Sequence, residues 1–102
     1  MVNEPATPDD VLRALATIHR LRILRALGEG DPWVSDLQTR LPLSQSALSQ
    51  HLARLRDAGI VATRRQGQAV AYRLLDREIL TLVDGLLRLV DQRENSSHAV
   101  LL

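Results

Sequence analysis

The chain of 102 residues contains no cysteine. Disulfide bonds, thiolate metal sites and thiol redox switches are therefore excluded within this sequence. No stretch approaches the roughly 18 consecutive apolar residues that span a bilayer, and the N-terminal residues lack the pattern of a secretory signal peptide. We therefore expect a cytoplasmic protein that makes no membrane contact and folds as one small domain, marginally stable as a monomer.

Lysine is absent as well, so all 13 basic side chains are arginines. The formal net charge is only +1, but it is unevenly distributed along the chain. From Arg40 to Arg73 there are six arginines and a single acidic residue, a net charge of +5, whereas the rest of the chain carries −4. Such a concentrated basic segment is typical of a nucleic-acid-binding surface, and arginine is suited to bidentate contact with phosphate.

Sequence signatures of catalysis are also missing. There is no glycine-rich phosphate loop, no nucleophile elbow and no pair of acidic residues in a plausible cleft. Asp9 and Asp10 stand at the expected start of a helix, where acidic side chains interact favourably with the helix dipole. We therefore expect no enzymatic activity, no catalytic residues and no cofactor.

Apolar periodicity predicts five helices and one β-hairpin. The helices are expected at about residues 9–16, 18–27, 34–40, 45–58 and 77–93. Thr17 and Ser44 are suitable N-caps for the second and fourth helices, and Gly59 is the expected C′ residue that ends the fourth. These features predict a mainly α-helical fold.

The hairpin follows the fourth helix directly. Its strands and turn are expected at residues 60–64, 69–74 and 65–68, respectively. Residues 1–8 and 94–102 are expected to form flexible tails. The single domain would then cover residues 9–93.

The fourth predicted helix has two unlike faces. Leu48, Leu52 and Leu55 recur at helical spacing and are expected to face a core. The opposite face carries small polar and amide side chains: Gln45, Ser46, Ser49 and Gln50. A merely solvated helix face usually mixes acidic and basic residues, whereas hydroxyls and amides suit the base edges of a DNA major groove. With the basic hairpin that follows, the order predicts a winged helix-turn-helix.

The last predicted helix carries more apolar surface than so small a domain can cover. A wide core helix is one interpretation. The preferred interpretation is a homodimer interface formed with the first helix, through Leu12, Leu15, Ile79, Leu82, Val83, Leu86, Leu87 and Val90. A dimer would present two recognition helices to two half-sites of a palindrome about one helical turn apart.

Six sequence blocks occur in an order that resembles a known family. They are Arg20-Leu-Arg-Ile-Leu-Arg-Ala-Leu27, Val34-Ser-Asp-Leu37, Leu43-Ser-Gln-Ser-Ala-Leu-Ser-Gln-His-Leu52, Leu55-Arg-Asp-Ala-Gly-Ile-Val61, Arg64-Arg65-x-Gly67 and Tyr72-Arg-Leu74. Together they resemble the ArsR/SmtB family of small dimeric bacterial winged-helix repressors, over roughly residues 9–92. The third block is most similar to the HlyU/BigR-type branch. The resemblance implies that the third and fourth helices bind DNA and that the first and last form the dimer interface.

The chain departs from this family at the sensor sites. Metal-sensing members carry Cys-x-Cys at the start of the third helix, where this chain has Asp31-Pro32-Trp33-Val34-Ser35-Asp36. Others bind zinc through an Asp-x-His in the last helix, but Asp84-Gly85-Leu86 lacks the histidine and leaves only His98 near Glu94. The two cysteines of the HlyU/BigR-type sensors are absent. We predict no metal site, and either control by the repressor's own concentration or a non-metal ligand.

The candidate DNA contacts lie on the fourth helix and the hairpin. They are Ser44, Gln45, Ser46, Ser49, Gln50, His51, Arg54, Arg64, Arg65 and Gln68. Glutamine can pair with adenine and serine with any base, whereas the hairpin should reach the minor groove or its phosphates. Ser44 is primarily an N-cap, although a helix N-terminus can also hold a phosphate. The alternatives are solvated polar and charged side chains and, for His51, a packed structural histidine.

Other polar and aromatic residues have simpler expected roles. His19 is expected to be structural, and with His51 and His98 it forms no plausible metal set because the three lie on separate elements. Trp33 is expected to seal the turn between the second and third helices, with a ligand pocket there as the alternative. Tyr72 fits core packing and phosphate contact equally well.

Two classes of function remain. The favoured one is a dimeric DNA-binding transcriptional repressor whose partner is double-stranded DNA with a palindromic operator. The alternatives are a winged-helix module that binds another protein, or a repressor that responds to an unidentified small molecule. A protein-binding module would favour a hydrophobic or acidic recognition face, and the predicted face is neither.

Overall fold

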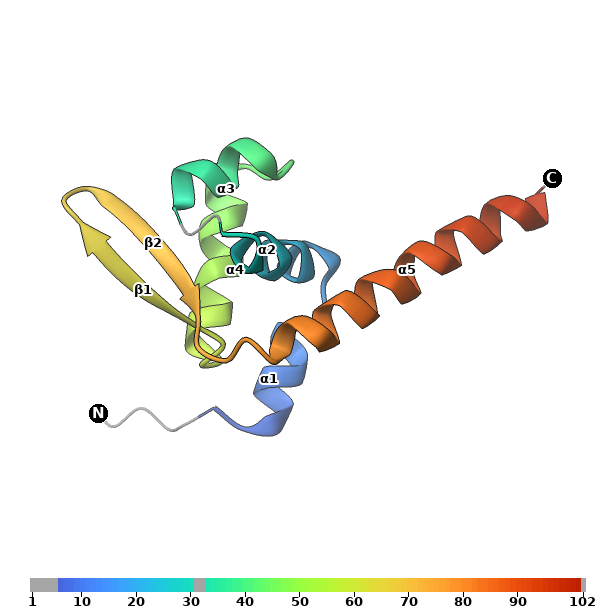
Figure 1. The fold of residues 1–102 in the computed structure, drawn as a ribbon, viewed down its shortest axis with the longest axis horizontal. Helices are drawn as coiled ribbons and strands as arrows, with labels where there is room; N and C mark the ends of the chain where they lie inside the picture. Colours follow the sequence, from blue (N-terminus) through green and yellow to red (C-terminus); the bar gives the residue numbers. More distant parts are fainter. Residues whose placement is uncertain (1–5, 31–32, 102) are drawn as a thin grey trace.

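A computed structural model describes residues 6–30 and 33–101, with side chains described up to residue 93. The elements are α1 (Pro8–Ala14), α2 (Ile18–Gly28), α3 (Val34–Arg40), α4 (Gln45–Asp57), β1 (Val61–Gln66), β2 (Ala69–Leu74) and α5 (Ile79–Leu101). This order confirms the predicted mainly α-helical fold with one hairpin. Figure 1 shows the hairpin extending from one side of the helical body and α5 from the other.

Helix α1 begins one residue earlier than predicted because a capping box precedes it. The Thr7 backbone N–H donates to Asp10 Oδ2 at 2.9 Å, and the Asp10 N–H donates to Thr7 Oγ1 at 3.1 Å. Pro8 occupies the first turn, where a missing N–H costs nothing. These bonds to Thr7 are the main reason that the pKa of Asp10 is lowered. Part of the predicted N-terminal tail is therefore helical, and residues 1–5 lie outside the described residues.

The predicted caps of the other helices are confirmed. Thr17 Oγ1 accepts a hydrogen bond from the Arg20 N–H at 3.2 Å at the start of α2, and Ser44 Oγ accepts from the Ala47 N–H at 3.1 Å at the start of α4. Gly59 follows α4 with a φ of +75°, the left-handed conformation that favours glycine. Local sequence therefore defines both ends of the predicted recognition helix.

The hairpin turn is shorter than predicted. Strands β1 and β2 pair antiparallel from Val61 opposite Leu74 to Gln66 opposite Ala69, which leaves Gly67 and Gln68 as a two-residue turn. Gly67 has a φ of +62° at the first central position, where a tight hairpin turn needs glycine. The predicted turn residues 65 and 66 consequently lie in β1.

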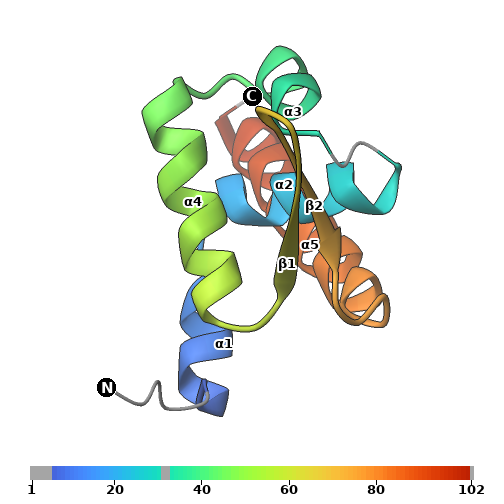
Figure 2. The same cartoon turned by 90° about the vertical axis from the view of Figure 1, so that its left-hand side faces the viewer.

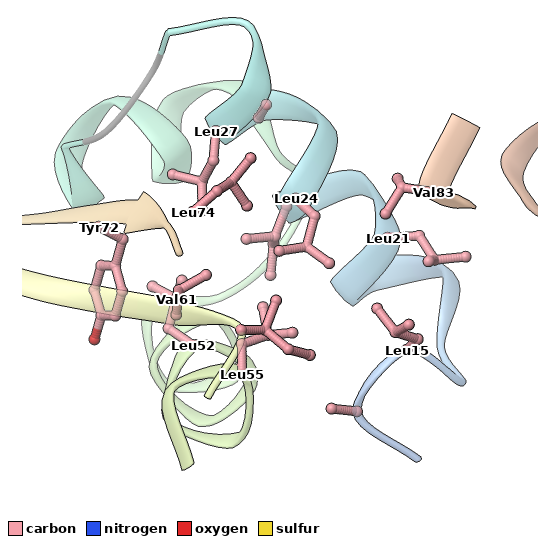
Figure 3. Close-up of a cluster of buried hydrophobic side chains, with 14 of the residues drawn as sticks. Leu15, Leu21, Leu24, Leu27, Leu52, Leu55, Val61, Tyr72, Leu74 and Val83 are labelled. Atoms are coloured by element: carbon pink, nitrogen blue, oxygen red, sulfur yellow. The ribbon is translucent and has the colours of Figure 1, made fainter. Parts of the chain in front are cut away.

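The core surrounds α2. Figure 3 shows side chains from the end of α1, from α2 and α4, from both strands and from α5 meeting there. The largest fully buried side chains are Ile23, Leu24, Leu37, Leu48, Leu52, Leu55, Val61 and Val83. Burial of one such side chain stabilises the fold by about 1.5–3 kcal/mol. The buried side of α4 is thus fixed against the centre of the domain.

Helix α5 differs from the prediction at both ends. It begins at Ile79 and continues to Leu101, so the backbone of residues 94–101 is helical where we predicted a tail beyond Arg93. The physical reason is that no proline or glycine lies between Arg93 and Leu101 to end the helix. Residue 102 lies outside the described residues.

Three residues predicted for the dimer interface belong to the core of the same chain. Leu15 is 5% exposed, Val83 is fully buried and Leu87 is 3% exposed. Periodicity identified the apolar side of α5 but not that α2 covers part of it. The apolar surface left for a second copy is therefore narrower than predicted.

Candidate nucleic-acid interface

The two faces predicted for α4 are present in the structure. Leu48, Leu52 and Leu55 are buried, whereas the opposite side chains are exposed: Gln45, Ser46, Ser49 and Gln50. No acidic residue precedes Asp57 in this helix. The exposed face therefore offers hydroxyl and amide groups, which both donate and accept hydrogen bonds.

The hairpin carries its two central arginines on opposite faces. Arg64 and Arg65 are consecutive in β1, and successive side chains of a strand alternate. The Arg64 Cζ atom lies 5.9 Å from the centroid of the Trp33 ring, a cation–π geometry. Arg64 is thereby held against the start of α3. Arg65 and Gln68 are exposed.

Trp33 connects the hairpin to the helix-turn-helix through its backbone as well. It precedes α3 and forms an isolated antiparallel bridge with Ala71 of β2. The side chain is half-buried. Its role thus extends beyond sealing the turn before α3, because it fixes the hairpin next to the two helices.

One groove joins the two predicted contact regions. It has a volume of about 500 Å³ and is lined by Trp33, Val34, Ser35, Gln38, Gln45, Ser49, Leu52, Ala53, Arg56, Gln68, Ala69, Val70 and Tyr72. None of these lining residues is acidic. Figure 2 shows α4 and the hairpin running alongside each other, with α3 at the end where the hairpin tip lies. The groove connects α3 and α4 to the hairpin turn through a mixed lining of serine, glutamine and apolar side chains, with Arg56 as its one basic residue.

Sequence reasoning missed several residues of this groove. Ser35 and Gln38 of α3 line it; the family resemblance implied that this helix binds DNA, but the individual contact residues were predicted only on α4 and the hairpin. Arg56 lines it too, while its Nε also lies 3.7 Å from Asp57 Oδ1. Tyr72 is only 9% exposed and belongs to the core, with its edge at the groove. The spacing of Ser35 and Gln38 on one side of a helix was the available signal.

Of the ten residues predicted to contact DNA, Gln45, Ser49 and Gln68 line this groove. Arg54 is exposed, but it lines a different cleft of about 330 Å³ together with Asp10, Arg13, Arg20 and Asp57. Arg56, rather than Arg54, therefore lines the same groove as Gln45 and Ser49. The exposed part of α4 is wide, and helical periodicity alone does not predict which edge of it lies next to the hairpin.

His51 is half-buried and packs against α2. Its Nδ1 lies 3.3 Å from Arg20 Nη1, and its ring centroid is 5.6 Å from that of His19. Burial lowers its pKa most, followed by the positive charges of Arg20, His19 and Arg54. These contacts favour the alternative of a packed histidine. His19 and His51 lie on separate helices, as expected, but their rings are neighbours. Within the described part of the chain, no three His, Asp or Glu side chains are placed to hold a metal ion.

This combination of fold and surface defines a class. A mainly helical domain with an exposed amide-rich helix, a basic hairpin and an acid-free groove between them is a winged helix-turn-helix regulator. None of the helices among the described residues is long and apolar enough to cross a membrane.

Comparison with known proteins identifies the family. Residues 19–63 match the family described as "Bacterial regulatory protein, arsR family". The transcriptional activator HlyU of Vibrio cholerae is 46% identical over 82 residues, which cover 80% of this chain and 76% of the relative. The biofilm growth-associated repressor of Agrobacterium fabrum is 38% identical over 76 residues, 74% of this chain and 65% of the relative. The chain therefore belongs to the ArsR family of bacterial transcriptional regulators.

Solved structures agree with this assignment. HlyU from Vibrio cholerae superposes with a TM-score of 0.69 at 46% identity, covering 79% of this chain and 88% of that one. A homodimeric winged helix-turn-helix DNA-binding domain from Mycobacterium bovis superposes with a TM-score of 0.68 at 28% identity, covering 82% and 78%. The predicted family and its HlyU-like branch are confirmed.

Proposed function

We propose that this regulator is a dimeric transcriptional repressor that binds an inverted-repeat operator in double-stranded DNA. The observation that carries the proposal is the acid-free groove of about 500 Å³ that joins the exposed polar face of α4 to the hairpin. A major groove admits a helix, and an adjacent basic hairpin can follow the backbone into the minor groove. Under this proposal the chain has no catalytic activity. It would act in the cytoplasm, because that is where the chromosomal DNA of a bacterium lies.

The contacts divide by chemistry. We assign base edges to the exposed side chains of α4: Gln45, Ser46, Ser49 and Gln50. Ser44 caps α4, and the N-terminus of this helix supports a phosphate contact. Arg65 and Gln68 are assigned to the sugar–phosphate backbone near the hairpin tip, and Arg64 contributes positive charge while it rests on Trp33. Base contacts give specificity and phosphate contacts give affinity.

The dimer rests on the apolar residues that stay exposed in the single chain. Leu12 of α1 is 63% exposed, and Leu82 and Leu89 of α5 are 48% and 50% exposed. Leu86 and Val90, on the same stretch of α5, are half-buried. A contiguous exposed apolar stripe on a small protein marks an interaction site. We therefore propose that α1 and α5 pair with the same helices of a second copy, a proposal supported by the homodimeric state of the similar domain from Mycobacterium bovis.

The test is fluorescence anisotropy of the purified protein with a labelled DNA fragment from upstream of its own gene, across salt concentrations. We expect specific binding that weakens steeply with salt, because each neutralised phosphate releases counterions. Zinc or a chelator should leave binding unchanged. Arg65→Ala should weaken binding to all sequences and lower the salt slope by about 1.

Arg88→Ala is the matched control, because Arg88 is an exposed arginine on α5, away from the groove. It should leave the salt slope unchanged. Absence of specific binding at low salt would refute the proposal and favour the winged-helix protein-binding module. Loss of binding on addition of zinc would reveal a metal site.

A further inference from the structure

Arg20 is a buried arginine at the junction of α1, α2 and α4. It is 9% exposed, and its Nε donates to the Ala14 carbonyl at 2.6 Å while Nη2 donates to the Arg13 carbonyl at 3.1 Å. These carbonyls end α1, where backbone acceptors have no partner within the helix and the helix dipole favours a cation. Arg20 therefore binds the C-terminal end of α1.

The third contact of Arg20 leads to the recognition helix. Its Nη1 lies 3.3 Å from His51 Nδ1 on α4. A guanidinium group only donates hydrogen bonds, so Nδ1 must accept and the proton of the neutral imidazole must be on Nε2. One side chain thus connects the end of α1 to α4 through a histidine whose tautomer is fixed by geometry.

The charges around His51 oppose its protonation. Arg20 and His19 face it from α2, and Arg54 from α4. Asp10 and Arg13 of α1, with Asp57 of α4, line the cleft shared by Arg20 and Arg54.

The two carboxylates of this cleft are engaged by other groups. Asp10 accepts from Thr7 and lies 3.6 Å from Arg13, and Asp57 lies 3.7 Å from Arg56. Within the described residues, no ion pair or hydrogen bond joins His51 to a carboxylate. Burial and these positive charges lower the pKa of His51.

We propose that Arg20 and His51 are positioning residues that fix the recognition helix relative to α1, and that full DNA affinity requires a neutral His51. The proposal rests on the proposed function of α4. Gln50 and Ser49, which are assigned to bases, immediately precede His51, and α1 is assigned to the dimer interface. The contact between Arg20 and His51 therefore connects α1, which helps to set the distance between the two recognition helices of the dimer, to α4, which recognises one half-site.

Protonation removes this connection. An imidazolium has no acceptor nitrogen, so the bond from Arg20 Nη1 is lost and two cations are left side by side. DNA affinity should therefore fall as pH falls. A His51 that contacts phosphate directly would act in the opposite sense, because its positive charge would strengthen binding at low pH. The sign of the pH effect separates the two roles.

The experiment measures Kd by anisotropy at about pH 7.5 and about pH 5.5 at constant salt. For the native protein we expect Kd to rise about fivefold on acidification, the effect of losing one net hydrogen bond. His51→Gln keeps an acceptor oxygen and does not titrate. In this variant the ratio of the Kd at the lower pH to the Kd at the higher pH should therefore fall most of the way to one. His98→Gln is the control and should keep the native ratio of the two Kd values. His19→Gln should keep or enlarge this ratio, because His19 is one of the groups that oppose protonation of His51.

A Kd that is unchanged or lower at about pH 5.5, or a ratio that persists in His51→Gln, would overturn the inference. Absence of DNA binding at both pH values would instead refute the proposed function. A separate readout needs no DNA: imidazole ¹⁵N shifts of the free native protein at about pH 7.5 should report a neutral His51 with its proton on Nε2. A proton on Nδ1 would overturn the inference whatever the DNA result.

Discussion

Helices α4 and α5 both carry an exposed face unlike that of an ordinary solvated helix, and they differ in kind. The exposed side of α4 presents hydroxyls and amides, whereas α5 leaves Leu82 and Leu89 half exposed. Their inner faces are alike, since Leu48 and Val83 are both fully buried against the same core. The comparison shows that the two helices share their core chemistry and differ in their outer faces, to which we assign the two proposed functions, DNA binding and dimerisation. A polar face suits a partner with hydrogen-bonding edges, and an apolar face suits an apolar partner.

The largest expected effect separates the two sides of α4. Leu48→Ala should lower the free energy of unfolding by about 2–5 kcal/mol, because Leu48 is fully buried and a cavity would remain. Ser49→Ala, one residue along on the exposed side, should change it by less than about 0.5 kcal/mol. Urea denaturation at one protein concentration measures both. Equal losses would show that Ser49 is part of the packing.

The next effect concerns the outer face of α5. Leu82→Asp combined with Leu89→Asp should give a folded monomer in analytical ultracentrifugation, because charge would be buried at an apolar interface. DNA affinity should fall roughly 10²-fold, since the second half-site is no longer held by the same particle. Thr81→Asp is the control, because Thr81 is exposed on the polar side of α5. A double variant that stays dimeric would place the interface elsewhere.

A smaller effect is expected at Gly85, in the middle of α5. A Cβ atom there meets no atom within 4 Å in the single chain. Gly85→Ala should therefore stabilise the helix by up to about 1 kcal/mol in thermal unfolding, because glycine is a poor helix former. Ultracentrifugation of the same variant gives a second result: weaker dimerisation would indicate close approach of the partner helix at this residue. If Gly85→Ala lowered the stability of the monomeric Leu82→Asp, Leu89→Asp variant, the expectation that an added methyl group meets no other atom of the same chain would be wrong.

The smallest effect is the dependence of stability on pH at His51. Its pKa in the folded state lies below the ordinary value of about 6.5, so the unfolded chain binds the proton more tightly. This contribution to stability is complete above about pH 6.5 and is lost as pH falls from there through the folded pKa. The native thermal midpoint should thus fall more on acidification than that of His51→Gln. Identical pH profiles would show that burial of His51 has no energetic consequence.

The features predicted from sequence are those with local causes. Thr17, Ser44 and Gly59 define helix ends through contacts a few residues away, and the alternation of α4 follows from helical spacing. The predicted end of α5 at about Arg93 was wrong, because no residue near that position ends a helix. Contacts between distant residues, such as Arg20 with His51 or Trp33 with Ala71, were missed because periodicity says which side chains share a face but not what covers it. The core positions of Leu15, Val83 and Leu87 were misassigned for the same reason.

The most direct test of the central claim is to measure the affinity of the native protein and of Gln50→Ala for an operator in which each half-site position is substituted in turn. If α4 contacts base edges, the native protein should lose about 1–3 kcal/mol of binding free energy at individual positions. Gln50→Ala should lose its discrimination at one position of each half-site and keep it at the others. An unchanged profile of discrimination in the variant, with only a uniform loss of affinity, would contradict the assignment of Gln50 to base recognition.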